Sequence, residues 1–73
     1  MRVRVFLRSP LFTLAGHVPR NASVLEGTVK EANDLGYTVV VESFADDRGR
    51  PLEGPGATLI LPREKIDHLL VVG

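Results

Sequence analysis

The sequence predicts an all-β fold in which five short strands form one small barrel domain over residues 1–73. Apolar and polar side chains alternate in the first two of these segments, and a period of two indicates a strand with one buried face. A third segment is dense in β-branched residues, which are enriched in strands. The stretches between the segments are rich in glycine, proline, asparagine and aspartate, which favour turns.

The first strand is predicted over residues 2–8, RVRVFLR. Val3, Val5 and Leu7 fall on one face, which we expect to be buried. The opposite face carries the arginines of the segment together with Phe6. The strand therefore has an apolar side and a basic side.

A connection of about fourteen residues leads to the second strand, which is longer than a hairpin turn requires. Ser9 as a cap, Pro10 at the first helical position and Gly16 as a terminator predict a short helical turn over residues 10–15. We expect this segment to be a structured excursion over the mouth of the barrel.

Residues 24–31 and 37–44 are predicted to form the central hairpin. In the first of these strands Leu25, Gly27 and Val29 share one face. The second strand, YTVVVESF, is rich in β-branched residues. The link ANDLGY supplies side chains that close a turn on their own backbone and a glycine that adopts positive φ.

After a polar loop, ADDRGRPLEGPG, two more strands are predicted, joined by one turn. ATLILP is the fourth strand and IDHLLVV is the fifth. Between them PREK predicts a one-turn helix, because Pro62 has no N–H to lose at the start of a helix. We expect Pro62 to open this corner and Ile66 to return the chain to the core.

This order of strands, with a long first loop and a one-turn link before the last strand, resembles the SH3-like small barrels and the related Sm-like fold. The LPREKI ending is similar to Sm-like and PRC-type barrel endings. The resemblance implies a five-stranded barrel whose copies join through the edges of the last two strands. The Sm hairpin pattern of glycine, aspartate and asparagine is not matched, because the positions that follow Gly27 hold Asn33 and Tyr37. The RNA-binding residues of Sm proteins are therefore not carried over.

The composition indicates a globular chain in a reducing compartment. Its 44% hydrophobic and 25% charged residues exclude a disordered chain. The absence of cysteine excludes disulfides and thiolate metal sites and favours a cytoplasmic location.

No apolar run approaches the roughly 18 residues of a membrane span, so we expect a soluble protein without a membrane partner. A domain of this size buries only about 60% of its unfolded surface, so assembly is a natural source of further stability.

The net charge is zero, but the charges are unevenly distributed along the chain. Residues 1–25 hold four arginines and no acid, whereas residues 26–54 hold seven acids and three bases. A general nucleic-acid-binding domain usually carries a basic excess overall, which this chain lacks. The basic first strand is equally suited to pairing with an acidic strand.

No pattern predicts a catalytic residue, a cofactor or a metal site, and we expect the protein not to be an enzyme. His17 and His68 are far apart in the sequence, without cysteine or H-E-x-x-H spacing. His68 shares the alternation of Ile66, so we expect a half-buried ring bonded to a neighbouring carbonyl. None of the serines stands in a G-x-S-x-G elbow.

The pair Asp46 and Asp47 precedes Gly49 and faintly suggests a cation loop. A calcium loop needs oxygen ligands at alternate positions, and arginines occupy the intervening positions here. A turn that an aspartate side chain caps and Gly49 closes explains the same residues better.

One cluster is a candidate for nucleic-acid or partner contacts, because small barrels bind single strands through basic grooves and aromatic platforms. Its members are Arg2, Arg4, Phe6, Arg8 and, at the central turn, Tyr37. Nucleic acid is not favoured, because the net charge is zero and only four residues are aromatic. In the favoured interpretation Phe6 covers residues 10–15 and the arginines form a solvated edge that deters aggregation.

The last two strands carry apolar side chains on both faces, whereas a small barrel buries only its inward face. The candidate oligomer interface is Leu59, Ile60, Leu61, Leu69, Leu70, Val71 and Val72. Two segments remain candidates to cover the outward apolar face of these strands: residues 9–16 of the same chain and an equivalent strand of a second copy. We therefore expect a binding or scaffold module that forms a homo-oligomer through these strands. The alternative is an Sm-like RNA- or ribosome-associated protein that uses its basic first strand.

Overall fold

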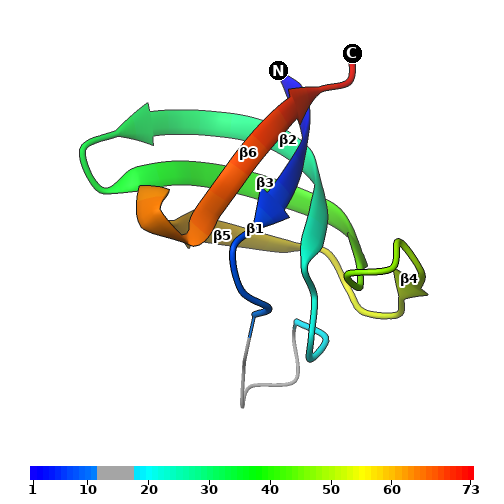
Figure 1. Cartoon of the computed structure of the whole chain (residues 1–73). Helices are drawn as coiled ribbons and strands as arrows, with labels where there is room; N and C mark the ends of the chain where they lie inside the picture. Colours follow the sequence, from blue (N-terminus) through cyan, green and yellow to red (C-terminus); the bar gives the residue numbers. More distant parts are fainter. Residues whose placement is uncertain (12–17) are drawn as a thin grey trace.

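A computed structural model describes residues 1–11 and 18–73 of the chain and confirms the all-β prediction. One antiparallel sheet curls on itself into a half-barrel (Figure 1). Its strands are β1 (Arg2–Leu7), β2 (Val24–Asn33), β3 (Gly36–Ala45), β4 (Pro51–Leu52), β5 (Ala57–Leu61) and β6 (Ile66–Val71). In this part of the chain there is no helix of the length and hydrophobicity needed to span a bilayer.

The strand order is β4-β3-β2-β1-β6, and β5 pairs with β3 alongside β4. The first strand of the chain therefore lies inside the sheet, between β2 and β6. The two chain ends lie side by side (Figure 1), and the N–H of Val72 donates to the carbonyl of Arg2 at 3.0 Å. Among the described residues, β5 pairs only with β3 and β6 pairs only with β1, so each keeps one unpaired edge.

The predicted strands correspond to β1, β2, β3, β5 and β6, and a two-residue strand, β4, is added inside the predicted polar loop. Asp46 closes the small hairpin that leads into β4. Its N–H donates to the carbonyl of Arg50, and its carbonyl accepts a hydrogen bond from the N–H of Gly49. A 3-10 turn, Arg63–Lys65, follows Pro62 at the predicted corner between β5 and β6. The helical turn predicted over residues 10–15 lies, from residue 12 onward, outside the described residues.

The core lies on the concave face of the sheet. The alternation predicted for β1 is confirmed, since Val3 and Val5 are fully buried against Leu25, Val39 and Val41. Burial of one aliphatic side chain contributes about 1.5–3 kcal/mol. The remaining buried hydrophobic residues are Val18, Ala22, Phe44, Leu61 and Ile66.

Three irregularities in the pairing bend the sheet. Glu42 is an extra residue on β3, because Val41 and Ser43 are opposite consecutive residues of β2. Lys30 is extra on β2 and Asp67 is extra on β6. A bulge bends its strand and increases the local twist, so these residues explain how a single sheet curls around its own core.

Gly27 lies where β2 approaches β3 too closely for a side chain. A Cβ at this position would overlap the carbonyl oxygen of Val40 and would lie 2.8 Å from the Cα of Val41. Both obstacles are backbone, which a rotamer change cannot relieve. The glycine therefore permits the close approach of the two bent strands.

We expect Gly27→Ala to lower the free energy of unfolding by about 1–3 kcal/mol, because overpacking against backbone forces the strands apart. Urea denaturation followed by circular dichroism measures this. The control Thr28→Ala, at the neighbouring outward position, should change the free energy by about 0.5 kcal/mol or less. Equal midpoints for Gly27→Ala and the unchanged protein would contradict the close approach.

Candidate functional site

The convex face of the sheet collects the side chains of the basic first strand. Residues directly opposite each other in an antiparallel pair lie on the same face. Two rows therefore cross this face from β6 to β3: His68, Phe6, Val24 and Ala45, and next to it Leu70, Arg4, Glu26 and Ser43. The face combines one aromatic row with one row of charges.

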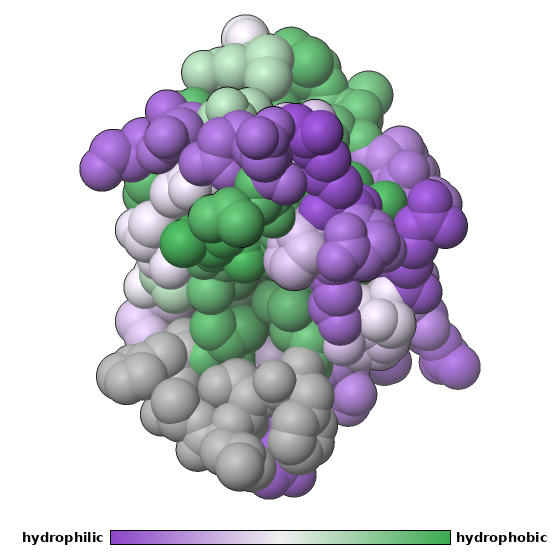
Figure 2. All heavy atoms as spheres, turned by 90° about the vertical axis from the view of Figure 1, so that its left-hand side faces the viewer, coloured by the Kyte–Doolittle hydropathy of each residue, from purple (hydrophilic) through white to green (hydrophobic). Residues whose placement is uncertain are grey.

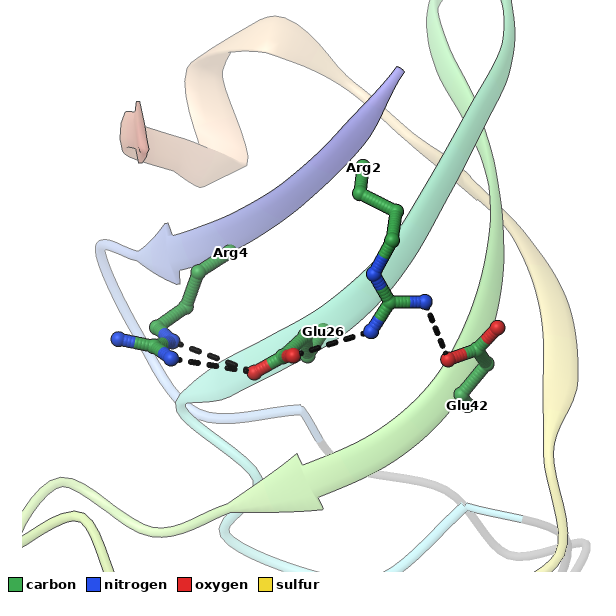
Figure 3. Close-up of polar contacts among 4 residues, drawn as sticks. All are labelled: Arg2, Arg4, Glu26 and Glu42. Carbon is green, nitrogen blue, oxygen red and sulfur yellow. Dashed lines mark hydrogen bonds and ion pairs between the residues drawn. The ribbon is translucent and has the colours of Figure 1, made fainter. Parts of the chain in front are cut away.

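The arginines of β1 are neutralised by carboxylates of β2 and β3 (Figure 3). Arg4 places Nε and Nη2 at 3.3 Å from Oε2 of Glu26, and Arg2 donates from Nη2 to Oε1 of the same residue at 3.1 Å. Arg2 also donates from Nη1 to Oε2 of Glu42 at 2.6 Å. Two cations and two carboxylates thus sum to zero, and part of the basic excess of residues 1–25 is compensated within the sheet.

The hydrogen bond that Arg2 donates to Glu42 is the main cause that raises the pKa of Arg2 above its ordinary value, so this guanidinium stays charged. These groups are exposed, and such ion pairs contribute about 1 kcal/mol or less. The prediction of a solvated basic edge is therefore wrong in one respect: β1 is an interior strand, and its arginines face acids on the neighbouring strands.

The ring of Phe6 stacks on that of His68, with ring centroids 4.3 Å apart and an angle of 11° between the planes. His68 also contacts Asp67, whose Oδ2 lies 2.8 Å from Nδ1. An ionised carboxylate only accepts hydrogen bonds, so Nδ1 donates. The expectation of a half-buried His68 bonded to a carbonyl is wrong, because the bulge at Asp67 puts His68 and Ile66 on opposite faces.

Beside this stack the convex face is hollowed into a pocket of about 400 Å³. Three strands and the β3–β4 hairpin contribute to its wall, which is made by Arg4, Phe6, Val24, Glu26, Ser43, Phe44, Ala45 and Gly49. The pocket therefore joins an apolar floor to a charged pair and a hydroxyl.

The other two residues predicted for this cluster lie elsewhere. Arg8 fastens the end of β1 to the corner, since its N–H donates to the carbonyl of Lys65 at 2.8 Å and its Nε to that of Ile66 at 3.2 Å. Tyr37 is the second residue of β3, and the guanidinium carbon of Arg63 lies over its ring, 5.9 Å from the ring centroid. The structure thus brings Arg2, Arg4 and Phe6 together on one face, without Arg8 or Tyr37.

The predicted oligomer interface divides into exposed and buried residues. Ile60, Leu70 and Val71 are 65%, 46% and 59% exposed, whereas Leu61 is 3% exposed and belongs to the core. The half-buried members are Leu59, Leu69 and Val72. Figure 2 shows hydrophobic surface exposed between hydrophilic side chains on one face of the molecule.

Sequence reasoning missed Glu26, Ser43 and Gly49 as neighbours of Phe6. They come from segments that only the pairing of β1, β2 and β3 brings together. The available signal was charge complementarity, because the basic first strand precedes an acidic segment.

Within residues 1–11 and 18–73, no group of three histidine, cysteine, aspartate or glutamate residues is placed to hold a metal ion. His17 lies outside these ranges.

The turn predicted at Asp46 is confirmed and shapes one wall of the pocket. Oδ1 of Asp46 accepts hydrogen bonds from the N–H groups of Arg48 and Arg50, both at 2.9 Å, and Oδ2 accepts one from Nε of Arg50 at 3.0 Å. Gly49 closes the turn with a φ of 80°. The N–H of Arg50 is the main cause that lowers the pKa of the Asp46 carboxyl below its ordinary value.

We expect this hairpin to loosen in acid. The pKa of Asp46 in the folded chain is lower than the value of about 3.9 for an unfolded aspartate. The ionised carboxylate therefore favours the folded hairpin above that pH, and this contribution is lost as the pH falls through the lower folded pKa. A carboxyl NMR titration, together with amide exchange at Arg48 and Arg50, measures both effects.

In Asp46→Ala the same two amides should exchange faster at neutral pH, whereas in Asp47→Ala they should keep their protection. A midpoint for Asp46 at or above about 3.9 would show that the N–H groups do not hold the carboxylate.

Comparisons with known proteins give no family for this chain. No protein-family model matches it, and neither a curated protein nor a solved structure is significantly similar.

Proposed function

We propose that this protein is a non-catalytic binding or scaffold module with a small SH3-like, Sm-like barrel fold, which self-associates through β5 and β6. The strand order β6-β1-β2-β3-β5 and the single turn between β5 and β6 support the fold part of the proposal. The sequence resemblance itself rests on the order of elements along the chain, including the long β1–β2 connection and this single turn.

The observation that carries the proposal is the pair of unpaired strand edges, each of which belongs to a strand with exposed aliphatic side chains. An exposed edge is a template for another strand, and proteins usually protect it with lysine, proline or a covering segment. β5 contains no charged residue and no proline, and Ile60 extends from it into solvent. β6 carries Leu70 and Val71 in exposed positions.

A second copy of the chain suits these edges. β5 and β6 have similar lengths, five and six residues, and each is free on one side among the described residues. Pairing β5 of one copy with β6 of the next extends the sheet with its faces in register. Ile60 lies on the convex face opposite Thr38, and Leu70 lies on the same face opposite Arg4.

Such a joint buries the exposed aliphatics against each other, at about 1.5–3 kcal/mol for each side chain fully covered. The two edges are different surfaces, so the contact is heterologous, and it generates a ring if the rotation between neighbouring copies closes.

The alternative of an RNA- or ribosome-associated protein has less support, because Arg2 and Arg4 of β1 are already paired with Glu26 and Glu42.

We expect the protein to be oligomeric at micromolar concentration and Ile60→Lys to convert it to a monomer. A lysine at this exposed position leaves the core intact and places a charge at the joint. Size-exclusion chromatography with light scattering gives the mass. The control is Leu35→Lys, which changes a 73% exposed apolar side chain at the β2–β3 turn and should keep the oligomer.

A cross-linking experiment tests the arrangement of the two edges. The chain has no cysteine, so Ile60→Cys and Leu70→Cys each introduce a single thiol. Under mild oxidation the mixture of the two variants should form more disulfide-linked dimer than either variant alone. A monomeric unchanged protein, or equal linking in all three samples, would contradict the proposal.

A further inference from the structure

The ring of Phe6 has an aromatic stacking partner on one face only among the described residues. β1 lies between β6 and β2, and Phe6 is opposite His68 on one side and Val24 on the other. His68 covers the first face of the ring in the parallel stack described above. The second face is turned toward β2, where Val24 lies opposite Phe6, and both residues line the 400 Å³ pocket.

The pocket has the composition of a small-molecule site. Its volume lies within the usual range of about 300–1,000 Å³ for ligand pockets, which combine apolar walls with a few placed polar groups. Phe6, Val24 and Ala45 supply the apolar surface, and Arg4, Glu26 and Ser43 supply the polar groups. The β3–β4 hairpin reaches the pocket at Gly49.

The charges in the pocket favour an uncharged ligand. Arg4 and Glu26 are paired with each other, and Arg2 and Glu42 complete a neutral group of four. Figure 3 shows one guanidinium nitrogen of Arg4 directed away from Glu26. Among the described contacts this nitrogen, Nη1, has no hydrogen-bond partner, and neither has the hydroxyl of Ser43.

From these observations we infer that the convex-face pocket binds a flat, uncharged heteroaromatic ring of the nucleobase type. The ring stacks on the face of Phe6 that is turned away from His68 and extends the His68–Phe6 stack to three rings. Arg4 Nη1 and the Ser43 hydroxyl hydrogen-bond to polar atoms on the edge of the ligand. Because the arginines are already neutralised, a phosphate on the ligand adds no affinity. This inference goes beyond self-association, since every wall of the pocket belongs to one chain.

The test is a titration of the isotope-labelled full chain with adenosine and with cytidine, followed by amide NMR. The largest shifts are expected at Phe6, Val24, Ser43, Ala45 and Gly49. Phe6→Leu should weaken binding at least tenfold, whereas Phe6→Tyr, which keeps the ring, should bind within about threefold of the unchanged protein. Tyr37→Leu removes an aromatic ring elsewhere and should have no effect.

Two further measurements define the ligand class. Adenosine monophosphate should bind no more tightly than adenosine, and raising the salt from about 50 to 200 mM should change the affinity less than twofold, in contrast to a phosphate-binding site. p-Cresol, a flat ring without the nucleobase edge, should bind at least fivefold more weakly than adenosine.

The inference is overturned by absent shifts at millimolar nucleoside, by equal binding in Phe6→Leu and Phe6→Tyr, or by a strong, salt-sensitive preference for the monophosphate. Repeating the titration with Ile60→Lys separates the two proposals. Binding should persist in that variant whether or not the unchanged protein is an oligomer.

Discussion

The structure depends on the pairing of β1 on both of its edges. β2 binds one edge and β6 the other, and no other strand among the described residues holds β6 in the sheet. The inward side chains of β1, Val3 and Val5, have no exposed surface and form the centre of the core. Its outward side chains, Arg4 and Phe6, meet partners from both neighbours. One strand of six residues thus organises the core and the convex face together.

The sequence was sufficient for the positions of the main strands, because a period of two is a local property. The bulges were not predictable in this way, since an extra residue is defined only by the partner strand. Phe44 shows the consequence: it lies three positions after Val41 and yet shares its buried face, because Glu42 is extra. β4 was missed for a related reason, as its two residues pair only because Asp46 closes the hairpin.

The convex face was predictable in part. The alternation in β1 correctly placed Arg2, Arg4 and Phe6 on one side of the strand. Glu26 and the pocket wall of β3 join them only through strand pairing, which adds long-range information that alternation lacks. The result changes the character of the face. A basic strip in the sequence becomes a surface in the fold on which Arg2 and Arg4 are paired with carboxylates.

The adjacency of the two chain ends has a consequence for how the fold is acquired. β1 pairs with β6 (Ile66–Val71), which is the last of the six strands to be synthesised, so this pairing cannot form until the other strands have been made. On the ribosome, β1 therefore waits with one edge unpaired until β6 has left the exit tunnel. Contacts this distant in sequence also slow folding in solution. We accordingly expect the hairpin of β2 and β3 to form early and the closure of β1 onto β6 to be a late step.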